Sequence, residues 1–439
     1  MVKVSILPSD KYQTMEGFGV SGAWWSQIIG GWSDENRKKI IELLFHKDKG
    51  IGMAIYRYNI GAGNGEEIKD RWRRTESFKV EDGSYNWEKD KNALKVLDEI
   101  NKIGVNRIVA FANSPVASMT KSGYVSGNID GTSNLKDECY KEFSEYLINV
   151  CEYLTKERNI PIEWISPINE PHWDWKKIKG QEGCHYSTSE CVKLIKILSK
   201  KIKESNSGLK IAAIEAGHWQ GAEEYIKDIF DDEELKEELK EFHVHSYFST
   251  TEDKEKATEF IKRNYPDIKL HMSEWTEMQD GRDYGMDSAL KLANEIYEDL
   301  TIPQVVSWQY WIAVSKYNYR DGLIYTNEGT EDIEETKRLW VMGNYSKFVK
   351  KGDCRIRCES SSDEIMTLAF ITDKGYKLVI INNADCNEEI NLKFNEENKY
   401  KNLIIYETSN RNNLENIYHG EYCDKFVVPG KSVTTVIIN

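Results

Sequence analysis

Residues 162–171 read IEWISPINEP and residues 269–276 read KLHMSEWT, two short apolar runs that each carry a glutamate near the end. Six more runs of this kind are present, at 16–25, 53–61, 106–115, 209–217, 241–248 and 305–313. Stretches with helical periodicity separate them, and one of these begins with a capping-box pattern at Ser187 and Glu190. Strands that alternate with helices form parallel βα units. Eight such units predict an α/β fold, a closed (β/α)8 barrel over residues 13–345.

The chain changes character after the barrel. Short alternating runs such as IMTLAFITD (365–373) and YKLVIINN (376–383) follow one another, separated by Gly, Asn and Asp. They predict a β-sandwich side domain over residues 346–439. The opening stretch VKVSILP (2–8) has the same pattern, so residues 1–12 are expected to add a strand to that domain.

Composition excludes several classes of partner. The 59 Lys and Arg against 73 Asp and Glu give a net charge of -14, which repels phosphate backbones and anionic lipid, so neither nucleic acid nor a membrane is expected as a partner. No run reaches the roughly 18 apolar residues that cross a bilayer. Since residues 1–10 lack the apolar segment of an export signal, a cytoplasmic protein is expected, or a secreted one if a signal was removed. The protein is also expected to be a monomer. The eight scattered cysteines are predicted to be reduced.

Two glutamates mark the predicted mouth of the barrel. Catalytic groups of (β/α)8 barrels stand at the C-terminal ends of strands, where Glu170 and Glu274 fall. Hydrolysis of a glycosidic bond requires such a pair of carboxylates. A single strand-end glutamate is more often a salt-bridged or solvated side chain. Here Asn169, whose amide can bind a sugar hydroxyl, and Trp275, which can shape a sugar pocket, favour the catalytic interpretation.

The motifs on these runs occur in a specific order. Asn-Glu-Pro at 169–171 with a glutamate on the seventh run resembles the retaining (β/α)8 glycosidases. The finer resemblance is to glycoside hydrolase family 30 and spans the barrel. It rests on GFGVSGAWW (17–25), YRYNIG (56–61), FANSP (111–115), SPINEPHWDW (166–175), HSY (245–247) and MSEW (272–275). The β-sandwich with its N-terminal strand is also similar to that family's architecture.

The resemblance implies roles for particular residues. Glu170 would be the acid/base and Glu274 the nucleophile of a retaining mechanism. Arg57 would keep the nucleophile ionised, because a nearby cation lowers a carboxylate pKa. Tyr247 would donate a hydrogen bond toward Glu274, and Asn169 would hold the sugar 2-hydroxyl. The alternatives are a structural ion pair for Arg57 and plain core packing for Tyr247.

Further residues are expected to contact the sugar. Aromatic rings pack against the C–H faces of sugars, and alternation places Trp308 and Trp311 on opposite faces of the last run, so one of them should line the pocket. His245 is either a substrate ligand or a structural histidine. The remaining substrate-binding candidates are Asn113, Trp173, His245, Trp275 and Trp311.

The substrate prediction rests on two segments after the fourth run. HWDW (172–175) and QEGCHY (181–186) resemble the endo-β-1,6-galactanase branch, which implies β-1,6-galactan as substrate. Xylan-cleaving enzymes, β-xylosidases, β-glucosidases and β-glucuronidases of the same family are alternatives. A glycan-binding barrel without activity is a third possibility, and a metal-dependent hydrolase using the His243 and His245 pair is a fourth. Two carboxylates suffice for the chemistry, so neither cofactor nor metal is expected.

Overall fold

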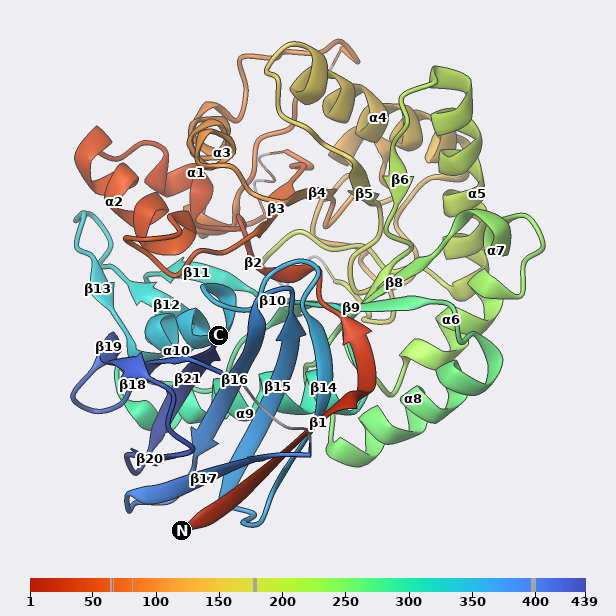
Figure 1. Cartoon of the computed structure of the whole chain (residues 1–439). Helices are drawn as coiled ribbons and strands as arrows, with labels where there is room; N and C mark the ends of the chain where they lie inside the picture. Colours follow the sequence, from red (N-terminus) through yellow and green to blue (C-terminus); the bar gives the residue numbers. More distant parts are fainter. Residues whose placement is uncertain (64, 66, 81, 177–179, 396–399) are drawn as a thin grey trace.

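The computed structural model describes residues 1–439 except 64, 66, 81, 177–179 and 396–399, and consists of a (β/α)8 barrel and a β-sandwich (Figure 1). The barrel strands are all parallel and follow the eight predicted runs. They are β2 (Gly17–Ser21), β3 (Ile55–Asn59), β4 (Arg107–Phe111), β5 (Trp164–Ser166), β6 (Lys210–Ile211) with β7 (Glu215–Ala216), β8 (Glu241–His245), β9 (Lys269–Trp275) and β10 (Ser307–Tyr310).

The fifth predicted run forms two short strands instead of one. Its first part, β6, pairs with β5, and its second part, β7, pairs with β8. The remaining strands are joined in the order β5-β4-β3-β2-β10-β9-β8. The split run therefore closes the barrel, and its end at Gly217 lies beside the end of the fourth run.

Helices surround the barrel because one face of each is apolar. In α3, Leu94, Leu97 and Ile100 are buried on a single face. The predicted capping box at Ser187 and Glu190 begins α5. The helices are α1 (Ser26–Ile29), α2 (Asp34–Phe45), α3 (Lys91–Ile103), α4 (Tyr140–Lys156), α5 (Thr188–Ser205), α6 (Ala222–Phe230), α7 (Leu235–Glu238), α8 (Thr251–Asn264), α9 (Met286–Thr301) and α10 (Lys337–Ser346). Single 3-10 turns are η1 (Arg71–Arg73), η2 (Ala117–Met119) and η3 (Asp137–Cys139).

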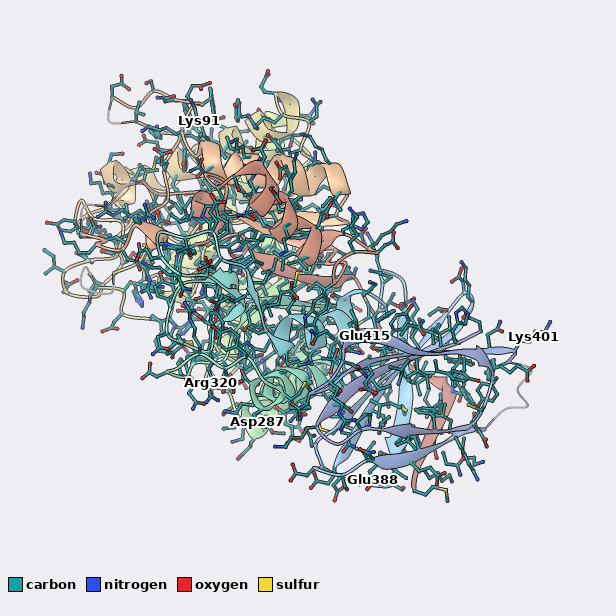
Figure 2. The ribbon with its side chains drawn as sticks, turned by 90° about the vertical axis from the view of Figure 1, so that its left-hand side faces the viewer. Lys91, Asp287, Arg320, Glu388, Lys401 and Glu415 are labelled. Atoms are coloured by element: carbon teal, nitrogen blue, oxygen red, sulfur yellow. The ribbon has the colours of Figure 1, made fainter. Side chains whose placement is uncertain are left out.

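The β-sandwich contains the N-terminal strand, as predicted. β1 (Val2–Thr14) lies between β14 and β17, antiparallel to the first and parallel to the second. The strands after the barrel are β14 (Cys354–Ser360), β15 (Ile365–Thr372), β16 (Gly375–Asn382), β17 (Glu388–Phe394), β18 (Asn402–Thr408), β19 (Asn413–Glu421), β20 (Lys425–Val428) and β21 (Ser432–Ile438). In Figure 2 this domain, which carries Glu388, Lys401 and Glu415, lies to one side of the barrel.

The two domains share a hydrophobic core. Phe370, Val379, Ile381 and Val433 of the sandwich belong to the same buried cluster as the barrel side chains. A second cluster lies wholly within the sandwich and includes Val4 of β1. Packing of this kind holds the domains as one body.

A small sheet without a predicted counterpart follows the last barrel strand. It consists of β11 (Ile312–Ser315), β12 (Gly322–Tyr325) and β13 (Glu334–Glu335). Its connection from β11 to β12 carries Tyr317, Tyr319 and Asp321 to the mouth of the barrel.

All eight cysteines are unpaired thiols. None of the helices in the described part of the chain has the length and apolar character needed to span a bilayer.

Candidate active site

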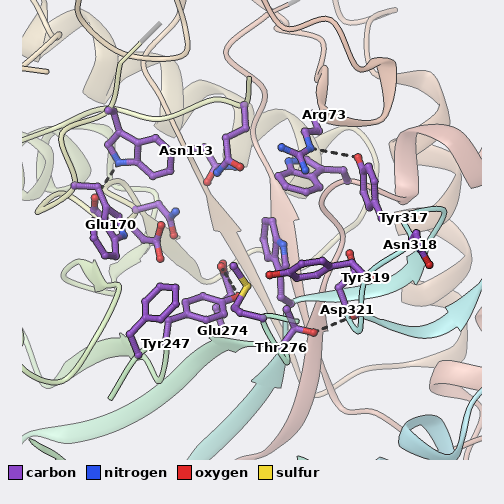
Figure 3. Close-up of a pocket in the computed structure, with 18 residues that line it drawn as sticks. Arg73, Asn113, Glu170, Tyr247, Glu274, Thr276, Tyr317, Asn318, Tyr319 and Asp321 are labelled. Atoms are coloured by element: carbon purple, nitrogen blue, oxygen red, sulfur yellow. Dashed lines mark hydrogen bonds between the residues drawn. The ribbon is translucent and has the colours of Figure 1, made fainter. Parts of the chain in front are cut away.

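A cavity of about 790 Å³ opens at the C-terminal ends of the barrel strands (Figure 3). In that view Glu170 and Tyr247 lie at one end, Glu274 lies in the middle, and Arg73, Tyr317 and Asn318 lie at the other end. We call these the Glu170 end and the Arg73 end. The lining residues are Trp24, Arg73, Asn113, Asn169, Glu170, Trp173, Trp175, Gln181, Tyr247, Phe248, Glu274, Thr276, Met278, Trp311, Tyr317, Asn318, Tyr319 and Asp321.

Glu170 and Glu274 come close to each other in the cavity wall. One carboxylate oxygen of each and one ring nitrogen of His245 all lie within 4.8 Å of one another. Retaining glycosidases keep their two carboxyl groups about 5 to 5.5 Å apart, whereas inverting ones leave about 6.5 to 9.5 Å for a water molecule. The short separation suits direct attack by one carboxylate.

The backbone around Glu170 is unusual and firmly held. Glu170 has a left-handed φ of 47°, which residues with a Cβ rarely adopt. Its N–H donates to the carbonyl of Glu215 at 2.7 Å, and its own carbonyl accepts from Trp175 Nε1 at 2.9 Å. A Cβ at Gly217 would lie 2.8 Å from Glu170 Oε1, so only glycine leaves room for the carboxylate there.

A bulge in β9 directs Glu274 into the barrel. His243 and His245 are two residues apart on β8, but their neighbours on β9, His271 and Glu274, are three apart. The pairing of β8 with β9 shifts register between Val244 and His245, which accounts for the extra residue. Bulges of this kind re-aim side chains near active sites.

Charged groups form a network behind the two glutamates. Arg57 donates to Glu274 Oε2 at 3.0 Å and forms an ion pair with Glu215 at 2.8 Å. His245 Nδ1 lies 3.0 Å from Glu170 Oε1, and its Nε2 lies 3.4 Å from Glu215 Oε2. Tyr247 donates its hydroxyl to Glu274 Oε1 at 3.2 Å. All six side chains are buried.

This network fixes the protonation of His245. Burial alone would lower the pKa of His245, but the charge of Glu274 and the hydrogen bonds to Glu170 and Glu215 outweigh it and raise the pKa to about 9. Burial raises the pKa of Glu274, and His245 and Arg57 oppose that rise. Three carboxylates and two cations leave one negative charge in excess.

Some of the residues predicted from the sequence line the cavity, and others lie in a layer of side chains behind the cavity wall. Those that line the cavity are Glu170, Glu274, Asn113, Asn169, Trp173, Tyr247 and Trp311. Arg57 and His245 lie behind the carboxylates and do not line it. Of the two tryptophans on the last run, Trp311 lines the cavity and Trp308 is buried in the core. Trp275 does not line it; its ring lies 6.1 Å from that of Trp308.

Several residues that sequence reasoning missed take part in the site. Glu215 links Arg57 to His245, and its position at the end of the fifth run was the signal that could have found it. Asp321 lines the Arg73 end, where burial raises its pKa to about 6. Arg73 lies 4.5 Å from the Trp24 ring and donates to the Tyr317 hydroxyl at 3.3 Å.

The predicted HxH pair is divided between two clusters. His245 belongs to the site above, whereas His243 stacks on His271 near Glu241, with ring centroids 4.7 Å apart. His271 and Glu241 surround His243. Arg107 donates to both oxygens of Glu241, which supplies the positive charge there.

A parallel barrel that presents paired glutamates in a cavity rich in aromatic rings is the architecture of a glycoside hydrolase. The chain belongs to O-glycosyl hydrolase family 30, whose family model matches residues 1–325.

Individual relatives agree with that membership. An endo-β-1,6-galactanase of Hypocrea rufa is 23% identical over 384 residues, which cover 80% of this chain and 75% of that one. A conserved exported protein of Bacteroides fragilis has a similar structure, with a TM-score of 0.89 and 24% identity over 99% of this chain and 100% of that one. The catalytic domain of the family 30 xylanase C of Talaromyces cellulolyticus has a TM-score of 0.79 and 19% identity, with both chains covered completely.

Proposed function

We propose that the protein hydrolyses β-1,6-linked galactan with retention of configuration, using Glu170 as acid/base and Glu274 as nucleophile. The observation that carries the mechanism is the approach of the two carboxylates to within 4.8 Å in one cavity wall. Sequence similarity to an endo-β-1,6-galactanase supports the substrate, as does the presence of Trp173 and Trp175 in the lining.

The proposed mechanism has two steps, in which Glu170 acts first as acid and then as base. Glu274 attacks the anomeric carbon and forms a covalent glycosyl ester, while Glu170 gives its proton to the departing oxygen. Glu170 then removes a proton from water, which attacks the same carbon and releases Glu274. Arg57 and Tyr247 hold Glu274 in place for attack. Asn169, whose Oδ1 is buried and has no partner in the described structure, accepts a hydrogen bond from the sugar 2-hydroxyl.

Removal of each glutamate gives a different result. Glu274→Ala should abolish turnover, and azide should restore part of it by giving a glycosyl azide of inverted configuration. Glu170→Ala should lose far more activity on natural glycans than on substrates whose leaving groups need no proton. Measured rates that fall equally on both substrate types would remove Glu170 from the acid role, and a fully active Glu274→Ala would end the nucleophile assignment.

The substrate is tested by digestion of polysaccharides. The purified protein should release galactose or short galacto-oligosaccharides from de-arabinosylated arabinogalactan, and chromatography of the products should identify them. Proton NMR should show the β-anomer first. Xylan in parallel is the control, because release from xylan alone would refute the galactanase assignment and leave the two-glutamate mechanism standing. Chelation with EDTA should leave the rate unchanged, since the reaction uses no metal.

A further inference from the structure

Phe248 combines two unfavourable features at the rim of the cavity. It directly follows Tyr247 beyond the end of β8 and has a left-handed φ of 53°, a conformation that is rare for a bulky residue. Its side chain is 65% exposed, so the phenyl ring gains little from burial in the protein. Strain of this kind persists at sites where the surrounding structure enforces it and where it serves a function.

The surrounding loop enforces the conformation from the backbone. Gln220 Nε2 donates to the Phe248 carbonyl at 2.7 Å and to Asp253 Oδ2 at 2.9 Å. Asp253 also completes the capping box with Thr250 that begins α8. The backbone of Phe248 is thus fixed to the start of a helix, while its ring remains exposed at the cavity.

The ring stands at the Glu170 end of the cavity. Its neighbour there is Trp173, at 6.3 Å between ring centroids and nearly perpendicular. Trp173 is tied to the Glu170 region, because its N–H donates to the Glu170 carbonyl at 3.4 Å. The other aromatic group, Trp24 with Trp311 at 5.2 Å, lies in the cavity with Arg73.

The proposed chemistry places different sugars at the Glu170 end and the Arg73 end of the cavity. An acid that protonates the departing oxygen must lie beside the leaving group, so the departing sugar occupies the Glu170 end. We propose that the ring of Phe248 is the platform on which the leaving-group sugar stacks, with the perpendicular ring of Trp173 as the adjoining wall. Phe248 thereby determines which leaving groups are accepted. The inference rests on the proposed function, because it takes Glu170 as the acid.

The test compares two substrates that differ only in their leaving group. β-1,6-Galactotriose departs with a sugar, whereas β-1,6-galactobiosyl fluoride departs with fluoride, which has no ring to stack. Phe248→Ala should lower kcat/KM on galactotriose at least tenfold and leave kcat/KM on the fluoride within twofold of the wild type. Val427→Ala, an exposed apolar residue of the sandwich, is the control and should change neither.

A second variant separates function from folding. Phe248→Asn should show the same selective loss but a higher Tm than the wild type, because asparagine tolerates the left-handed region better than phenylalanine. Equal losses on both substrates, or no loss on galactotriose, would overturn the platform.

Failure of the proposed function has a different signature. It would appear in the wild type as no cleavage of either galactose substrate. In that case the same comparison, with xylotriose and xylobiosyl fluoride or the corresponding pair of whichever sugar is cleaved, still decides the role of Phe248.

Discussion

Glu215 is a third buried carboxylate next to the two proposed catalytic ones. Burial raises its pKa, but Arg57 and His245 outweigh that effect, so the pKa lies below its ordinary value and the group is ionised. Its oxygen Oε2 contacts both cations, at 2.8 Å from Arg57 and 3.4 Å from His245. Together with the charge of Glu274 and the hydrogen bond to Glu170, Glu215 therefore helps to keep His245 protonated and able to donate toward Glu170.

Glu215→Gln should shift the alkaline limit of activity. The folded-state pKa of His245 is raised to about 9, so the protonated form is present below that pH and is lost as the pH rises through it. Protonated His245 donates to Glu170 and so holds the acid in position. Removal of one carboxylate lowers the pKa of His245, so the alkaline limb of kcat/KM should move to lower pH, at a lower maximal rate. The pH–rate profile measures the shift.

Glu182→Gln is the matched control for that experiment. Glu182 is equally buried, yet it hydrogen-bonds Ala62 and Thr75 and contacts neither cation. Its variant should leave the alkaline limb in place. A limb that stays at the wild-type pH in Glu215→Gln would contradict the assigned role.

Sequence reasoning identified residues that end strands and, through the family resemblance, the contacts of Arg57 and Tyr247 with Glu274. It missed Glu215. Glu170 and Glu274 followed from their positions on parallel runs. Glu215 ends the fifth run in the same way, but its ion pair with Arg57 joins residues far apart in the chain, and spacing carries no sign of it. The prediction for Trp275 assumed that its side chain reaches the pocket, and the register shift in β9 changes which side chains do so.

The small sheet of β11, β12 and β13 depends on one buried arginine. Arg338 donates through Nε and Nη2 to the Gly322 carbonyl, at 3.1 and 2.7 Å, and through Nη2 to the Tyr325 hydroxyl at 2.8 Å. It is fully buried, and none of the ion pairs in the described structure includes it. Because β12 begins at Gly322, this contact fixes Asp321 at the Arg73 end of the cavity.

Arg338→Lys should loosen that end of the cavity. Lysine keeps the charge but cannot reproduce the planar fork that reaches two acceptors at once. We expect KM for galacto-oligosaccharides to rise about tenfold, with Tm lowered by loss of buried hydrogen bonds worth about 1 to 3 kcal/mol. Steady-state kinetics and thermal unfolding measure both. An unchanged KM with a lowered Tm would restrict Arg338 to a structural role.

At the level of elements, periodicity predicted the barrel strands and the sandwich well. The small sheet was not predicted, because its strands have only 4, 4 and 2 residues and are too short to show an alternating pattern. The division of the fifth run into β6 and β7 was also invisible, because both parts lie in one continuous apolar stretch.

The common core predicts that the barrel and sandwich unfold together. Phe370 of β15 is buried among barrel side chains, and its truncation leaves a cavity. Phe370→Ala should destabilise the protein by about 3 to 5 kcal/mol and still give one calorimetric transition. Activity and tryptophan fluorescence should be lost at the same temperature. Val427→Ala should leave the midpoint unchanged, and two separate transitions in the wild type would refute the common core.

Stability of the whole chain should fall as the pH rises from about 4 to about 8, and Asp90 is one cause. Burial raises its pKa from 3.8 to about 8, and only the hydrogen bond from Tyr58 opposes this. The native state therefore retains a proton that the unfolded state loses above about pH 4. Asp90→Asn should flatten this part of the curve. Urea unfolding at several pH values measures it, and an equally steep curve in the variant would exclude Asp90.

The position of β1 has a consequence for synthesis of the protein. β1 precedes the barrel in the chain, yet Val4 pairs with Ser360 and Val2 with Ile390. At about 5 to 20 residues per second, a ribosome takes tens of seconds to produce those partners. During that time the barrel can form while β1 has no strand to pair with. An unpaired strand edge is where intermolecular pairing begins. A nascent chain of this protein is therefore exposed to aggregation at β1, and chaperones that bind chains during synthesis should matter more to its yield than those that act on completed chains.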